Sequence, residues 1–244
     1  MNELYLLIGT AAFLGFFHTA TGPDHYIPFI VLSKARKWTQ TRTMWITFIS
    51  GIGHILGSVI LGIIGIALGI SLSKLELIEA HRGNIVSYLL LTFGLLYTAY
   101  GLYKFFTKGK HFHLPGFLIP KRIRRLQHVV THQPYDLNKN FRVSDDTEDV
   151  TKITPWILFL IFVFGPCEVL IPLLIFPAAK FSAMGIASVS IVFGITTILT
   201  MLIIVFLGYK GASTIKIKDG DRYFHLIAGM GILISGLGMQ FFGW

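Results

Sequence analysis

Charged residues and cysteines are both scarce in this sequence. Charged side chains make up 14% of the 244 residues, whereas apolar side chains make up 53%, and the mean hydropathy is +0.67. This composition excludes a large soluble domain and predicts an integral membrane protein. The single cysteine, Cys167, excludes an internal disulfide. The first residues lack the basic stretch of a cleaved signal peptide, so we expect the first apolar segment to be retained as a membrane span.

Acidic residues are also few, 12 against 21 lysines and arginines, which gives a formal net charge of +9. The basic residues fall in short loops between apolar segments, where they set the orientation of a membrane protein. The segments between the apolar spans are not expected to form a basic domain with stacking aromatic residues, so nucleic acid is not an expected partner. The lipid bilayer is the expected surroundings of most of the chain.

Long apolar segments dominate what remains, and they predict an all-α membrane protein with six transmembrane helices. The first segment is too long for one straight helix, because about 31 residues at about 1.5 Å each would reach about 46 Å. We therefore expect a kink or a half-helix hairpin within it. The six segments cover about 3–33, 44–70, 84–106, 154–179, 183–208 and 223–243.

Basic residues alternate between the predicted loops. The first, third and fifth loops are rich in lysine and arginine, whereas the fourth carries only Lys180. The positive-inside rule then places loops one, three and five in the cytoplasm and both termini outside. In the second loop, Lys74 and Arg82 are offset by Glu76 and Glu79.

An internal repeat relates the two halves of the chain. GPDHYIPFIVLSKA in the first segment resembles GPCEVLIPLLIFPAA in the fourth, and GIGHILGS in the second resembles GITTILTM in the fifth. Three spans separate the copies, so the second copy enters the membrane from the opposite side, as an inverted three-plus-three repeat. The alternative is chance similarity between apolar segments. The matched positions are Gly22 with Gly165, Pro23 with Pro166, Asp24 with Cys167 and His25 with Glu168.

The repeat also divides the chain into three parts. Residues 1–106 form the first transmembrane repeat and residues 154–244 form the second, inverted one. Between them, residues 107–153 form a basic, histidine-containing cytoplasmic loop. Secondary transporters built on inverted repeats place broken helices and their ligand site at the repeat interface near the membrane midplane. We expect broken helices in spans one and four.

The stretch FFHTATGPDHYIP places three ionisable residues near the first of these breaks. His18, Asp24 and His25 surround the Gly22-Pro23 pair inside an otherwise apolar segment. Pro23 removes a backbone donor and disfavours helix for the residue before it, so the helix should be interrupted here. Ionisable residues at membrane depth cost at least about 2.5–3.5 kcal/mol, which makes them candidates for a functional site.

Acidic residues within the predicted spans are limited to Asp24 and Glu168, and no lysine or arginine accompanies them there. A bound cation or a proton is then the natural counter-charge. The two acidic residues form a set of carboxylate and imidazole ligands together with the two histidines of the first segment and His54 of the second. That set suits Ni²⁺, Co²⁺, Zn²⁺ or Fe²⁺ better than Na⁺ or Ca²⁺, and Cys167 could add a soft ligand.

Simpler readings of these residues stay open. His54 alone could be a packing residue, Cys167 a small buried apolar residue, and Glu168 a protonated, hydrogen-bonded acid. In the third loop, His128 and His132 are spaced to capture a metal ion at the cytoplasmic mouth, although solvated histidines would look the same. The many glycines of the spans most simply permit close helix packing.

The motifs HTATGPDH, GHILGS and FGPCEVLIPLL resemble the UreH-like urease-accessory membrane proteins and the wider nickel/cobalt transporter group. This group, called NicO or NiCoT, is related to sulfite exporters of the TauE/SafE type and to the thiol-disulfide carriers of cytochrome c biogenesis. The resemblance implies that His18, Asp24 and His25 select the metal, that His54 is their partner, and that the chain lies in a prokaryotic inner membrane. Classical nickel/cobalt permeases have four residues between the first histidine and the Asp-His pair, whereas this chain has five. The thiol-disulfide carriers use paired cysteines, and here Asp24 stands where one would be expected.

The sequence therefore predicts a transporter of a divalent transition-metal ion, nickel or cobalt foremost, that works by alternating access and is not an enzyme. No permanent cofactor is expected; the metal ion is the substrate, protons are the natural coupling ion, and a homo-oligomer is compatible with the sequence. Three alternatives stay open. They are an exporter of a small anion such as sulfite or an organosulfonate, a membrane redox carrier using Cys167, and an accessory protein that delivers metal for urease or hydrogenase maturation.

Overall fold

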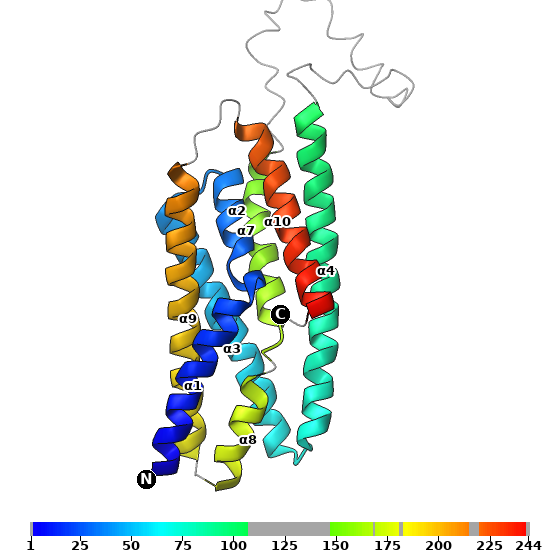
Figure 1. Cartoon of the computed structure of the whole chain (residues 1–244). Coiled ribbons are helices and arrows are strands. Elements are labelled where there is room, and N and C mark those ends of the chain that lie inside the picture. The colour runs from blue at the N-terminus through cyan, green and yellow to red at the C-terminus, as the bar shows by residue number, and fades with distance from the viewer. Residues whose placement is uncertain (1, 107–146, 168, 181–182, 215–219, 243–244) are drawn as a thin grey trace, which may run out of the picture.

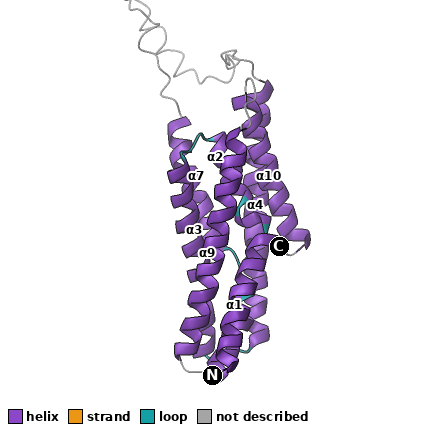
Figure 2. Ribbon diagram, turned by 60° about the vertical axis from the view of Figure 1, so that its left-hand side comes forward, coloured by secondary structure: helices purple, strands orange, loops and turns teal. Residues whose placement is uncertain are grey.

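The computed structural model describes residues 2–106, 147–167, 169–180, 183–214 and 220–242 (Figure 1). Almost all of these residues are helical and none of them lies in a β-strand, as Figure 2 shows. Five of the described helices are long and apolar enough to cross a membrane. The chain is thus an all-α membrane protein, as predicted. These five are α1 (Asn2–Thr21), α3 (Gln40–Ala67), α4 (Leu72–Phe106), α9 (Ala183–Thr214) and α10 (Gly220–Phe242).

Two helical segments are interrupted where the sequence predicts breaks. After α1, the 3₁₀ turn η1 (Pro23–His25) leads into α2 (Ile27–Ala35). In the second half, α7 (Thr147–Phe164) ends just before Gly165-Pro166, and α8 (Leu170–Lys180) follows. The proline in each break lacks a backbone N–H and so cannot continue the helical hydrogen bonds. Residues 147–153, predicted to belong to the third loop, instead form the start of α7.

Helix α4 corrects the prediction that the third span begins near residue 84. It begins at Leu72, so the second loop shrinks to residues 68–71, where Gly69 adopts a left-handed φ of 65°. The added turns remain packed against the rest of the molecule. The buried face of α4 continues into them through Gly83, Glu79 and Leu75. Charged residues on the exposed faces of these first turns lower their mean hydropathy, so the apolar pattern of the sequence did not indicate a helix there.

The half-helices of the two interrupted segments occupy opposite halves of the bundle. In Figure 1, α1 and α8 lie toward one end and α2 and α7 toward the other. Helix α1 packs against α9 and α7 against α3. Helix α2 packs mainly against α10, whereas α8 packs mainly against α9 and α3 and has a smaller contact with α4. One buried apolar cluster draws on α2 and α7 and another on α1 and α8, and Cys167 of the second break belongs to the second cluster.

Glycines bring α4 and α10 into backbone contact. A Cβ added at Gly94 would lie 2.6 Å from the backbone nitrogen of Leu233, and one added at Gly229 would lie 2.4 Å from that of Thr98. No side chain fits at such distances, so glycine is required at both positions. The expectation that glycines permit close helix packing is confirmed for this pair of helices.

Candidate metal centre

Three potential metal ligands meet at the two helix breaks. His18 lies in the last turn of α1, His54 in the middle of α3, and Cys167 directly after the second break. One ligand atom from each lies within 4.8 Å of the other two, and His18 Nε2 is 4.0 Å from Cys167 Sγ. Ligands of a tetrahedral ion at about 2.0–2.3 Å lie roughly 3.4–3.8 Å apart, so a contraction of about 1 Å would close the three around an ion.

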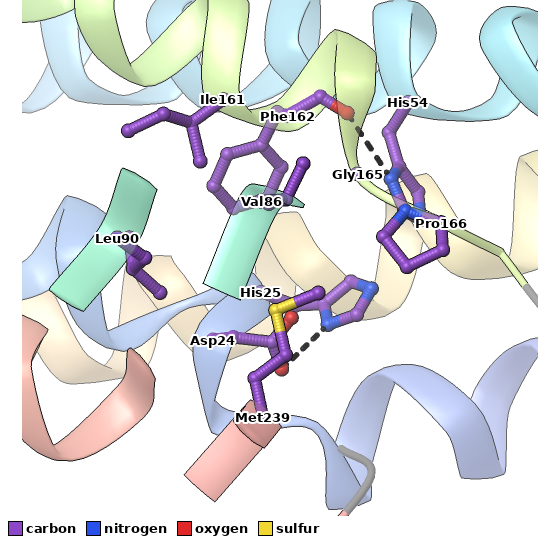
Figure 3. Close-up of a pocket in the computed structure, with 10 residues that line it drawn as sticks. All are labelled: Asp24, His25, His54, Val86, Leu90, Ile161, Phe162, Gly165, Pro166 and Met239. Atoms are coloured by element: carbon purple, nitrogen blue, oxygen red, sulfur yellow. Dashed lines mark hydrogen bonds and ion pairs between the residues drawn. The ribbon is translucent and has the colours of Figure 1, made fainter. Parts of the chain in front are cut away.

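His25 and Asp24 lie against this group from the 3₁₀ turn. The ring of His25 meets those of His18 and His54 edge-on, with centroid distances of 4.7 and 5.1 Å. Its Nδ1 is 3.1 Å from Asp24 Oδ1, and a dashed line marks this contact in Figure 3. A Cβ at Gly22 would lie 2.8 Å from this Nδ1 and 3.0 Å from the carboxylate oxygen, so only glycine lets the turn close this tightly.

The two buried histidines have one ring nitrogen engaged and the other available. His54 Nδ1 lies 3.3 Å from the carbonyl oxygen of Phe162, and His25 Nδ1 lies against Asp24. The Nε2 atoms of both rings are buried and have no hydrogen-bond partner among the described residues. Metal-binding histidines commonly donate one N–H to a carbonyl or carboxylate, which leaves the lone pair of the other nitrogen for the ion. His54 has this arrangement, whereas His25 Nδ1 lies at ion-pair distance from Asp24 Oδ1 without a hydrogen bond between the two atoms.

A small cavity lies beside these rings (Figure 3). Its volume is about 20 Å³, which holds about one water-sized particle. Asp24, His25 and His54 form its polar side, and apolar side chains such as Leu90 and Met239 form the rest. A single dehydrated ion fits this space, whereas a larger organic substrate does not.

An ion pair in α4 lies beside the second break, and sequence reasoning missed it. Glu79 is 1% exposed, and its Oε1 accepts a hydrogen bond from Arg82 Nη1 at 2.5 Å. Its Oε2 accepts the backbone N–H of Cys167 at 3.2 Å. Arg82 Nη2 donates to the carbonyl oxygens of Gly165 at 3.2 Å and Val163 at 3.4 Å. The prediction that Glu79 and Arg82 belong to the second loop is therefore wrong, because both lie in α4, a helix long and apolar enough to cross a membrane.

A signal for this pair was present in the sequence. Glu79 follows Leu75 by four residues and precedes Val86 by seven, so it shares their face of the helix. Arg82 lies one turn after Glu79, the spacing of a helical ion pair. The buried face of α4 thus includes Glu79, whose charge is neutralised by the neighbouring Arg82.

The remaining predicted site residues lie outside the described residues. These are Glu168, directly after Cys167, and the loop histidines His128 and His132. Their roles stay predictions. Of the others, His18, His54 and Cys167 lie together, His25 contacts both histidine rings, and Asp24 reaches the group through His25.

Comparisons of the chain with protein-family models, with curated proteins and with solved structures found no match. The resemblance of HTATGPDH and FGPCEVLIPLL to the nickel/cobalt transporter group stays a prediction.

Proposed function

We propose that this chain is a membrane transporter of a divalent transition-metal ion, with Ni²⁺ or Co²⁺ as the foremost substrates. The observation that carries the proposal is the meeting of His18, His54 and Cys167, with ligand atoms within 4.8 Å of one another. Imidazole and thiolate ligands favour later transition metals over Na⁺, Ca²⁺ or Mg²⁺. His54 and Cys167 are only 3% and 0% exposed, so an ion bound here would be shielded from both aqueous sides.

Each residue has a distinct role in this proposal. His18, His54 and Cys167 bind the ion, and His25 joins them through its available Nε2. Asp24 orients His25 and supplies negative charge, and it lies just before the N-terminus of α2, whose partial positive charge stabilises a carboxylate. The predicted contribution of Glu168 is to complete the ligand set or to exchange protons.

Alternating access is the proposed mechanism, with the six spans arranged as an inverted repeat. The packing pattern supports it, because exchanging the two halves of the chain maps several of its contacts onto one another. The contact of α1 with α9 corresponds to that of α7 with α3, and the contact of α2 with α9 to that of α8 with α3. In transporters of this kind, one repeat rocks against the other around a ligand site between them. We further propose that loops one, three and five are cytoplasmic and that the membrane is a prokaryotic inner membrane.

Protons are the proposed coupling ion. Histidine and cysteine bind metal in their deprotonated forms, so metal binding releases protons and protonation favours metal release. A proton gradient across the membrane would thereby drive the ion in one direction.

Transport by the purified chain in proteoliposomes tests the proposal. A metal-sensitive dye inside the vesicles would report entry of Ni²⁺, Co²⁺, Zn²⁺, Mn²⁺ and Fe²⁺ in turn. We expect His54→Ala to abolish transport and His81→Ala to preserve it, because His81 is an exposed residue of α4. Binding without transport would favour the metal-delivery accessory role, and transport of sulfite in place of metal would favour the anion exporter.

The redox alternative has less structural support. Cys167 is 0% exposed, so an external thiol partner has no direct access to its sulfur. The anion alternative would need a cation at the site, and the charge of Arg82 is matched by Glu79.

A further inference from the structure

We propose that the Glu79–Arg82 pair of α4 is a positioning element that holds the second break so that the Cys167 thiol faces His18 and His54. The inference deepens the proposed function, because it identifies what controls one ligand of the metal site. Its first test, on the reactivity of Cys167, does not depend on metal binding.

Breaking a helix leaves backbone groups without their usual partners, and the ion pair satisfies them at this break. Arg82 donates to the carbonyls of Val163 and Gly165 at the C-terminal end of α7. Glu79 accepts the N–H of Cys167, on the side that leads into α8. The cation thus lies at a helix C-terminus and the anion ahead of a helix N-terminus, which is the favourable orientation in both helix dipoles.

The first break needs no such help, because its own backbone closes it. The N–H of Gly22 donates to His18 O at 3.0 Å, that of His25 to Gly22 O at 3.0 Å, and that of Tyr26 to Pro23 O at 3.3 Å. The second break also has backbone hydrogen bonds, from Gly165 N–H to Phe162 O at 3.0 Å and from Leu170 N–H to Cys167 O at 2.9 Å. The N–H of Cys167, however, donates to a side chain from another helix. A shift of α4 against α7 and α8 would therefore move Cys167 while leaving His18 and His25 in place.

Gly57 of α3 makes room for this arrangement. A Cβ at this position would lie 2.6 Å from the carbonyl oxygen of Val163 and 3.2 Å from Arg82 Nη2. Any side chain here would push α3 away from α7 or displace the guanidinium group from the carbonyls. The pair is thus fixed from a third helix, and Gly57→Ala disturbs it without changing a charge.

The coupling has a direct consequence for the metal site. Glu79 is buried, so losing Arg82 leaves an uncompensated charge that must move toward water or become protonated. Either change releases the Cys167 N–H and frees the chain between α7 and α8. The thiol then loses its orientation toward the two imidazoles, and the ion keeps only nitrogen and oxygen ligands.

The first experiment measures alkylation of Cys167 in the purified full chain by N-ethylmaleimide. Cys167 is the only cysteine, so the total labelling rate reports on this residue alone. We expect the rate to rise at least tenfold in Glu79→Gln and Arg82→Met, and to rise less in Arg82→Lys, which keeps the charge but not the planar fork. Glu76→Gln is the matched control, because Glu76 is exposed one turn earlier on the same helix, and its rate should equal that of the unmodified chain.

Thermal unfolding recorded in parallel separates a local change from loss of the fold. Labelling is carried out well below the unfolding midpoint of each variant, so that the rate reports on Cys167 in the folded protein. If a charge variant fails to fold, Gly57→Ala tests the same contact without a change of charge. Wild-type labelling rates in folded Glu79→Gln, Arg82→Met and Gly57→Ala would overturn the proposal. So would an equal acceleration in Glu76→Gln.

The second experiment follows coordination with Co²⁺, whose thiolate complexes show a charge-transfer absorption band that imidazole complexes lack. We expect the band in the unmodified chain and in Glu76→Gln, and its loss in Glu79→Gln and Arg82→Met, with Co²⁺ affinity at least tenfold weaker. An unchanged band in both folded variants would overturn the proposal. If the unmodified chain binds no metal, the proposed function fails, whereas faster alkylation of the variants would still support the positioning role.

Discussion

His18 Nε2 lies 4.0 Å from the sulfur of Cys167, although the two residues are 149 positions apart in the chain. The contact joins the end of α1 to the break that follows α7. Because His18 lies in the N-terminal half of the chain and Cys167 in the C-terminal half, an ion bound between them would connect the two halves directly.

The thiol can be tested by Cys167→Ser, which keeps the size of the side chain and removes the soft ligand. We expect Ni²⁺ or Co²⁺ affinity to fall about tenfold, equivalent to about 1.4 kcal/mol, because a hydroxyl is a poor ligand for these ions. Competition titration of the purified protein against a metal-binding dye measures the change. An unaltered affinity would mean that Cys167 only fills space.

The charge of the first break can be tested by Asp24→Asn, which keeps the shape of the side chain. We expect metal accumulation in cells to fall far more than after His128→Ala or His132→Ala in the third loop. His25→Ala should give a loss similar to Asp24→Asn, because the two side chains lie 3.1 Å apart and act on the same ring. Equal effects from the loop and span substitutions would contradict a site inside the membrane.

Acid should weaken metal binding. A thiol must lose its proton to bind the metal, so we expect affinity to fall steadily as the pH is lowered from about 8 to about 5.5. Calorimetry in two buffers of different ionisation enthalpy would show protons released on binding at neutral pH. An affinity that does not change over this range would exclude the Cys167 thiolate as a principal ligand.

Helix packing can be tested at Gly94, whose Cβ would meet the backbone nitrogen of Leu233 at 2.6 Å. We expect Gly94→Ala to lower the free energy of unfolding by about 1–3 kcal/mol, because α4 and α10 must separate. Gly211→Ala in α9 is the control, since a Cβ there meets no atom within 4 Å. Thermal unfolding in detergent compares the two variants. Equal midpoints would contradict the tight α4–α10 contact.

The sequence predicts the two breaks and most of the candidate site because these depend on local chemistry. Pro23 and Pro166 interrupt helices whatever surrounds them. The internal repeat then indicates that Cys167 lies opposite Asp24, and the structure brings both into the neighbourhood of His54.

What could not be predicted depends on side-chain directions and on contacts between distant helices. Adjacent residues Asp24 and His25 differ in role because the 3₁₀ turn aims the imidazole at the other rings and leaves the carboxylate behind it. The burial of Glu79 and Arg82 was hidden because hydropathy counts each charge separately, whereas the pair is neutral and hydrogen-bonded to a break 81 or more positions away.

The two breaks are closed in different ways, one by its own backbone and the other by its backbone together with side chains from α4. In the proposed inverted repeat, identical hinges would give inward and outward opening equal energy barriers. Hinges of unequal stiffness would make one of the two openings faster than the other, while a gradient would still set the direction of net transport.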